Sequence, residues 1–285
     1  MENIENFPVD IPMPREEVEA LNAYSAPLEG RRNMLRLDFN ENTIGPSPLV
    51  IQALKEIKRE EVSIYPEYSG LKQTFAKNLN NQNPNININP SEIGIFNGVD
   101  ASINAIFHAY GNKNELMLTT SPTFGYYTPC AQMRGMKINS IPYEGKDFQY
   151  PFDSICEFIT ENHPKILLIC NPNNPTGTRL SPERIIEIAK LSSKTLVVVD
   201  ELYEAFTGDS VLPIVNFQKT PNLIVLRSLS KTAGLASLRI GFAIGHSTVI
   251  NIVNRVTGPY DVNSFAVIAA FAALKDQSYI DSYVN

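Results

Sequence analysis

Apolar residues recur along this chain with two different spacings, and the two alternate from residue 47 onward. Apolar residues three or four positions apart predict helices over residues 14–22, 47–58, 70–79, 100–110, 124–134, 152–161, 181–191 and 262–274. Short runs of apolar and β-branched residues predict strands over residues 92–96, 115–119, 137–142, 165–170, 195–199, 223–226 and 240–244. Residues 80–90, rich in asparagine and proline, predict a loop. The alternation predicts an α/β fold, a three-layer α/β/α sandwich around a mostly parallel central sheet.

Composition and charge narrow the class of protein. The chain has 285 residues, of which 43% are hydrophobic and 19% charged, as in globular proteins. A net charge of -6 argues against nucleic acid as the main partner. The sequence has no apolar run of membrane-spanning length and no signal-peptide core, so we expect no membrane association. Three scattered cysteines and three scattered histidines favour free thiols in a reducing cytoplasm over disulfides or a metal site.

Ligands of such sheets bind beyond the carboxyl ends of the strands, so the residues that follow each strand are the candidates for chemistry. Lys231 follows the strand predicted at 223–226, lies after Ser228 and between two hydroxyl residues, Ser230 and Thr232, and precedes Arg239 by eight residues. A partly buried lysine loses its proton readily, and the neutral amine can form a Schiff base with a carbonyl. Hydroxyls and a guanidinium suit a phosphate. The segment therefore fits pyridoxal phosphate (PLP), a phosphorylated aldehyde, although a solvent-exposed loop lysine is the alternative.

Other strand ends carry further candidates. Asp200 follows a buried strand, where a carboxylate needs a positive partner such as a pyridinium N–H, unless it only caps a helix. Asn174 lies in a loop made rigid by two prolines and a glycine. The glycine turn at residues 97–100 opens a helix and offers backbone N–H groups to an anion, which is a weak signal. Residues 122–127 present aromatic rings, for which core packing is the alternative.

Together these motifs resemble a known family. Asn-Pro-Thr-Gly at 174–177, Asp-Glu-Leu-Tyr at 200–203 and Ser-Leu-Ser-Lys at 228–231, with Arg-Ile-Gly at 239–241, resemble the fold-type I PLP-dependent aminotransferases of class I/II. Further motifs make the chain most similar to the histidinol-phosphate aminotransferase branch: Tyr24-x-x-Pro27-x-x-Gly30, Leu-Asp-Phe-Asn-Glu-Asn at 37–42, Gly-Pro-Ser-Pro at 45–48, Tyr65-Pro66 and residues 122–127. The resemblance covers roughly residues 20–275.

The resemblance implies a role for each matching residue. Lys231 would form the Schiff base with the cofactor and move the substrate proton, and Asp200 would pair with the pyridine nitrogen. Asn174 and Tyr203 would hold the phenolic oxygen, and Phe124 would stack on the ring. The residues implied for the cofactor phosphate are Gly98, Val99, Asp100, Ser228, Ser230, Arg239 and, from a neighbouring subunit, Tyr65. Tyr24 and Asn42 are the substrate-side candidates, and no metal is implied.

The function implied by the resemblance is transamination. An amino group would move between an L-amino acid or histidinol phosphate and 2-oxoglutarate or glutamate, as in histidine biosynthesis, in a cytoplasmic homodimer with shared active sites. Two alternatives stay open at this point. One is a PLP-dependent decarboxylase of a phosphorylated amino acid of the threonine-phosphate type. The other is a chain that binds PLP without turnover.

The chain departs from the family near its end. Family members usually continue into a smaller C-terminal domain that carries an arginine for the substrate α-carboxylate, whereas this chain ends at Asn285. We therefore expect an N-terminal arm over residues 1–45, a large PLP-binding domain over 46–260, and the start of a largely missing, truncated small domain over 261–285. The uncovered apolar surface predicts low solubility.

Overall fold

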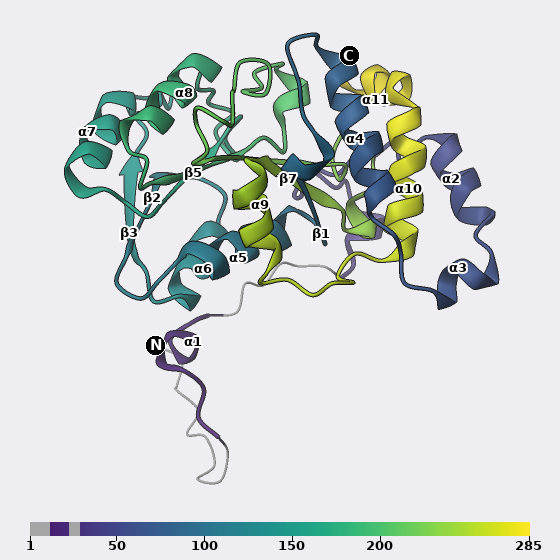
Figure 1. Cartoon of the computed structure of the whole chain (residues 1–285), viewed down its shortest axis with the longest axis horizontal. Helices are drawn as coiled ribbons and strands as arrows, with labels where there is room; N and C mark the ends of the chain where they lie inside the picture. Colours follow the sequence, from purple (N-terminus) through teal and green to yellow (C-terminus); the bar gives the residue numbers. More distant parts are fainter. Residues whose placement is uncertain (1–11, 23–28) are drawn as a thin grey trace.

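The computed structural model describes residues 12–22 and 29–285, which form helices on both faces of a seven-stranded sheet (Figure 1). The fold class predicted from the sequence is confirmed. The strands are β1 Ile93–Phe96, β2 Leu116–Ser121, β3 Lys137–Pro142, β4 Ile166–Cys170, β5 Leu196–Asp200, β6 Leu223–Ser228 and β7 Gly241–Gly245. Their order across the sheet is β1-β7-β6-β5-β4-β2-β3.

β7 runs opposite to the other six strands of the sheet. It pairs antiparallel with both β1 and β6, and the remaining strand pairs are parallel. All strands except β7 therefore end at one edge of the sheet, and β7 starts there. No α-helix crosses the sheet between β6 and β7. The chain therefore reverses direction at the end of the sheet where β6 finishes, and β7 pairs antiparallel with β6.

The helices begin where the sequence provides caps. Ser47 and Ser181 each accept a hydrogen bond from a backbone N–H of the first turn, and each is followed by a proline that needs no such bond. The α-helices are α1 Glu16–Glu19, α2 Pro48–Lys55, α3 Arg59–Ser63, α4 Ser69–Gln82, α5 Val99–Tyr110, α6 Tyr127–Met133, α7 Phe152–Asn162, α8 Pro182–Leu191, α9 Ser247–Asn254, α10 Ser264–Lys275 and α11 Gln277–Val284.

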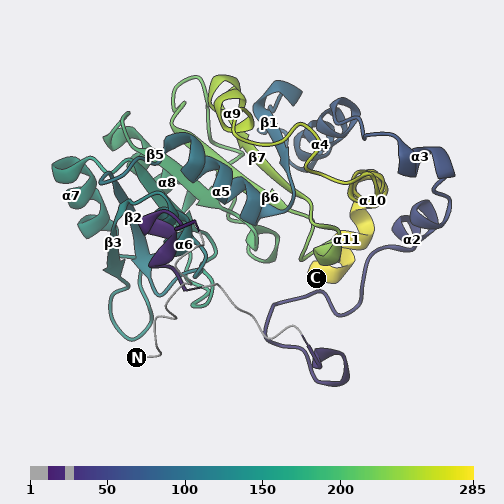
Figure 2. The same cartoon turned by 90° about the horizontal axis from the view of Figure 1, so that it is seen from below.

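Neighbouring residues of each central strand pack on opposite faces of the sheet. In β5, Val197 and Val199 pack in the same cluster as α4, α7, α8 and α10, while Leu196 and Val198 pack with α5, α6 and α9. Figures 1 and 2 show these two helical layers with the sheet between them. Burial on both faces explains why the central strands are continuous apolar runs.

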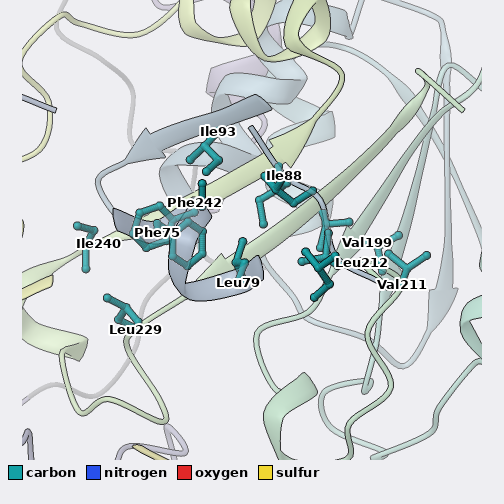
Figure 3. Packing of buried hydrophobic residues seen from close by; sticks show 14 of the residues in the cluster. Phe75, Leu79, Ile88, Ile93, Val199, Val211, Leu212, Leu229, Ile240 and Phe242 are labelled. Carbon is teal, nitrogen blue, oxygen red and sulfur yellow. The ribbon is translucent and has the colours of Figure 1, made fainter. Parts of the chain in front are cut away.

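The core also anchors the loop that carries Lys231. Phe75 of α4 stacks on Phe242 of β7, with ring centroids 3.8 Å apart. Leu229 and Ile240, at the two ends of the loop between β6 and β7, belong to the same buried cluster (Figure 3). The alanines of α10 are buried in this cluster too, where α10 packs against α2 and α4.

The division of the chain into domains at residues 45 and 260 stays a prediction.

Some predicted boundaries are wrong. The helix predicted over 124–134 begins at Tyr127, because Pro129 has no N–H and fits only within a first turn. The strand predicted from residue 240 begins at Gly241, since Arg239 adopts a left-handed conformation with φ 56°. The predicted loop at 80–90 starts later, since α4 continues through Gln82. The described residues include no helix long and apolar enough to cross a membrane.

Candidate active site

Loops that were singled out by sequence meet at the carboxyl edge of the sheet. The neighbouring parallel strands β4, β5 and β6 end at Cys170, Asp200 and Ser228. The rigid loop at 171–177, the segment 200–203 and the Lys231 loop follow directly, so the sheet brings three distant motifs together. This is the arrangement expected of a ligand site in an α/β fold.

Lys231 is half-buried and its amine points at the N-terminal segment. Its Nζ donates a hydrogen bond to the Phe39 carbonyl oxygen at 2.6 Å and lies 5.9 Å from the centre of the Tyr203 ring. Burial lowers the pKa of Lys231, and the nearby Arg239 lowers it further, against Glu41 and Asp100, which raise it. A lowered pKa increases the fraction of neutral amine, the form that attacks a carbonyl.

Asp200 is almost fully buried at the end of β5. Tyr127 donates its hydroxyl to Asp200 Oδ2 at 2.8 Å, and the Leu202 N–H donates to Oδ1 at 3.2 Å. Burial raises the pKa of Asp200 to about 6, although both hydrogen bonds lower it. No cation of the described residues forms an ion pair with Asp200, so a protonated ring nitrogen would supply the charge that an ionised carboxylate needs here.

The Tyr127 hydrogen bond leads to a first prediction. We expect Tyr127→Phe to reduce the free energy of unfolding of the cofactor-free protein by about 1–3 kcal/mol at pH 7, because a buried carboxylate loses a donor. The loss should be smaller at pH 5, where Asp200 is mostly protonated. Urea unfolding at both pH values measures it. Tyr150→Phe is the matched control, since the buried Tyr150 hydroxyl has no partner. An equal loss at both pH values would contradict the assignment.

Tyr203 and the N-terminal segment contact each other above the Lys231 loop. Asn40 Nδ2 donates to the Tyr203 hydroxyl at 3.2 Å, and Asn42 Nδ2 donates to the Thr232 carbonyl at 3.1 Å. Asn42 also accepts from the backbone N–H groups of Ile44 and Gly45. The side chain of Asn42 therefore contacts Thr232, the residue that follows Lys231, and holds the N-terminal segment against the Lys231 loop.

Backbone N–H groups and a guanidinium lie together at the start of α5, an arrangement that can bind an anion. Gly98 precedes α5 with φ 81° and leaves the first N–H groups of the helix without a side-chain cap. A Cβ on Gly98 would lie 2.6 Å from Arg239 Nη2, so only glycine lets this guanidinium approach the helix start. Arg239 also binds Asp100 Oδ2 at 3.0 Å. The Ser228 hydroxyl lies 2.8 Å from that of Ser230.

The rigid loop at 171–177 is joined to the aromatic loop at 122–127. Asn173 Nδ2 donates to the Pro122 carbonyl at 3.0 Å, and Asn173 Oδ1 accepts from Thr123 at 2.7 Å. The backbone N–H of Asn174 donates to the Cys170 sulfur at 3.4 Å. Phe124 makes an edge contact with Tyr127, at 5.4 Å between ring centroids. Phe124 and Asn174 therefore lie on two loops that are tied to each other.

Two sequence candidates do not join this cluster within the chain. Tyr65 lies after α3, is 68% exposed, and stacks on Tyr260 with ring centroids 4.0 Å apart. The resemblance assigned it to a neighbouring subunit, which a single chain does not test. Tyr24 lies outside the residues that the structure describes.

Sequence reasoning missed three residues of the site: Asn40, Tyr127 and Asn173. Each contacts a partner at least 50 positions away in the sequence. Asn40 and Tyr127 do lie within quoted motifs, 37–42 and 122–127, and Asn173 precedes a third. The motifs were therefore a usable signal, although they did not show which side chain faces the site.

The arrangement fits PLP. It offers an amine for the aldehyde, a buried carboxylate for the ring nitrogen, a hydroxyl for the phenolic oxygen, and at the far end backbone N–H groups and a guanidinium for the phosphate. The close approach of Arg239 to Gly98 is the feature that an ordinary turn would not need.

Comparisons with known proteins agree with PLP as the cofactor. Residues 32–285 match the family described as aminotransferase class I and II. The histidinol-phosphate aminotransferase of Thermoanaerobacter pseudethanolicus is 33% identical over 265 residues, covering 92% of this chain and 72% of that protein. A dihydroxyacetone phosphate transaminase of Campylobacter jejuni is 34% identical over 260 residues, covering 89% and 67%.

A solved structure shares the fold. The histidinol-phosphate aminotransferase of Sinorhizobium meliloti, crystallised in complex with pyridoxal-5'-phosphate, superposes with a TM-score of 0.86 over 97% of this chain and 74% of that chain, at 23% identity. The chain belongs to the class I and II aminotransferases, a family of PLP-dependent transaminases.

Proposed function

We propose that this chain uses PLP to transfer an amino group between a phosphorylated amino compound and the 2-oxoglutarate/glutamate pair. The observation that carries the proposal is the meeting of Lys231, Asp200 and Tyr203 at the carboxyl edge of the sheet. Histidinol phosphate is the first candidate substrate, because that name is borne by a relative 33% identical to the chain. The amine that corresponds to dihydroxyacetone phosphate, the ketone in the name of a second relative, is the other candidate, and it too carries a phosphate; in that case the ketone would accept the amino group from glutamate.

The side chains then have separate roles. When bound, PLP supplies a ring that withdraws electrons from the substrate. Asp200 would keep the ring nitrogen protonated, and Asn174 and Tyr203 would bind the phenolic oxygen. Phe124 would stack on the ring. The amine of Lys231, with a pKa lowered chiefly by burial, would hold the cofactor and then carry the proton at the substrate Cα.

Phosphate and substrate would bind at opposite ends. The cofactor phosphate would accept hydrogen bonds from the backbone at Gly98, Val99 and Asp100 and from Ser228, Ser230 and Arg239. Asn42, whose side chain lies next to the Lys231 loop, is the proposed substrate contact, together with Tyr24.

A half-reaction tests the proposal. PLP-loaded protein is mixed with glutamate, histidinol phosphate, phenylalanine or threonine phosphate, and conversion to pyridoxamine phosphate and release of carbon dioxide are recorded. We expect conversion with glutamate and with histidinol phosphate, faster than with phenylalanine. Carbon dioxide release from threonine phosphate without a 2-oxo acid would favour a decarboxylase. Conversion no faster than with free PLP would leave a cofactor-binding chain without turnover.

We further propose a homodimer with shared active sites. Tyr65 and Tyr260 form an exposed stacked pair, and Val62 and Ile64, which precede Tyr65 in the chain, are 59% and 58% exposed. Such an apolar surface suits a second copy of the chain. If Tyr65 serves the partner's site, mixing Tyr65→Ala with Lys231→Ala restores up to about a quarter of wild-type activity, because hybrid dimers hold one intact site. No recovery in verified hybrids would contradict shared sites.

A cytoplasmic location, with a role in histidine biosynthesis, completes the proposal. Cys130, Cys156 and Cys170 are free thiols, which suits a reducing compartment. Burial raises the pKa of each thiol, so these cysteines are poor nucleophiles.

A further inference from the structure

Asn40 lies on the N-terminal strap, residues 38–45, which crosses the Lys231 loop. Its Nδ2 donates to the Tyr203 hydroxyl at 3.2 Å. We propose that Asn40 is a positioning residue that turns the Tyr203 hydroxyl proton toward the phenolic oxygen of bound PLP. The inference rests on the proposed function, and it concerns a side chain that sequence reasoning did not select.

The direction of the hydrogen bond carries the argument. An amide N–H can only donate, so it occupies a lone pair of the Tyr203 oxygen and leaves the hydroxyl proton for another acceptor. Among the described residues, no acceptor for that proton appears. The bound phenolic oxygen would complete a chain from amide to hydroxyl to oxygen, in which each bond polarises the next.

The strap is clamped on both sides of Asn40. Arg31 binds both carboxylate oxygens of Asp38 at 2.7 Å and Glu41 Oε2 at 3.0 Å, and its guanidinium lies 3.9 Å from the centre of the Phe39 ring. The Phe39 carbonyl accepts from Lys231. Asn40 itself has φ 50°, a left-handed conformation that asparagine tolerates. The amide is therefore held in place although its side chain reaches solvent.

The charged and titratable groups that face Tyr203 are few. Lys231 Nζ lies 5.9 Å from the ring centre, and Asp200 and Cys170 raise the pKa of Tyr203 after burial, which is the largest cause. Asn40 acts in the opposite direction and lowers this pKa. A strengthened donor to the phenolic oxygen stabilises its negative charge, so the bound cofactor gives up its proton at lower pH.

The test is a pH titration of the visible absorption of PLP-loaded protein. Variants are Asn40→Ala, Asn40→Asp, Tyr203→Phe and the double variant Asn40→Ala/Tyr203→Phe. Asn40→Ala should raise the midpoint by about 0.4 to 1 pH unit, the effect of one neutral hydrogen bond. Asn40→Asp should raise it further, because a carboxylate accepts the Tyr203 proton. Tyr203→Phe and the double variant should titrate alike. Asn33→Ala, an exposed amide upstream of the strap, is the control and should match wild type.

Two results would overturn the proposal: an unchanged midpoint in Asn40→Ala, or the same shift in the presence and in the absence of the Tyr203 hydroxyl. A wild-type protein without any Lys231-dependent band would instead defeat the proposed function, so the two failures are distinguishable.

Discussion

We expect Lys231→Ala to remove the visible band of bound PLP and to lower transamination by about 10⁴-fold or more. The expected loss is large because one amine has two roles, the covalent link and the proton transfer. Its half-buried position beside Tyr203 and Arg239 favours the neutral form that both roles require. No second lysine is among the residues that we place around the site.

The measurement is an absorption titration with PLP, followed by single-turnover assays with glutamate. Lys194→Ala is a matched control, since Lys194 lies before β5 at the opposite edge of the sheet. Added small amines should restore part of the proton transfer in Lys231→Ala but none of the covalent band. A band that survives in Lys231→Ala and disappears in another lysine variant would refute the assignment.

Asp200→Asn should separate stability from activity. The raised pKa of Asp200, about 6 against 3.8, means that the folded cofactor-free protein favours the protonated carboxyl. The stability that this group contributes is present below pH 4 and is lost as the pH rises through about 6. A shift of about 2 pH units corresponds to on the order of 3 kcal/mol. The neutral asparagine avoids this loss, so the cofactor-free variant should be more stable at pH 8 and nearly unchanged at pH 4.

Activity should change in the opposite direction. Without the carboxylate the ring nitrogen of PLP is no longer kept protonated, and transamination should fall by about two to four orders of magnitude. Urea unfolding at pH 4 and pH 8 and glutamate half-reactions give the two readouts. Asp209→Asn, which alters a partly buried carboxylate paired with Arg179, is the control. A cofactor-free Asp200→Asn that is less stable at pH 8 would show that the carboxylate is compensated within the fold.

The local sequence pattern was enough to predict the strands of the sheet and the candidate residues that follow them. The strands within 165–170 and 195–199 place apolar residues on both faces of the sheet, a pattern typical of central parallel strands. Asp200 ends the second of these strands, so its place at the carboxyl end of the sheet could be predicted. The helix α9 escaped prediction because its sequence, Ser-Thr-Val-Ile-Asn-Ile-Val-Asn, is rich in β-branched residues that also suit strands. Packing on the sheet decides its conformation.

Contacts between distant segments could not be read in this way. The strap reaches Tyr203 across 163 positions, and Tyr127 reaches Asp200 across 73. Side-chain direction at such distances depends on how loops close over the sheet, and neither periodicity nor capping signals specify that closure. The antiparallel direction of β7 could not be predicted for the same reason, because it depends on how the loop between β6 and β7 folds back at one end of the sheet.

The reversal of β7 has a consequence for how this site can evolve. Gly241 is in register with Ser228 on one side and with Phe96 on the other, so the strands alone bring the two ends of the Lys231 loop to the start of α5. Strand register thus places Ser228 at the same end of the sheet as the start of α5, whereas Ser230, Lys231 and Arg239 are positioned by the loop between the two strands. Insertions in the middle of this loop, between Lys231 and Arg239, would change where the amine lies, while Ser228 and the start of α5 keep the positions that the strands give them.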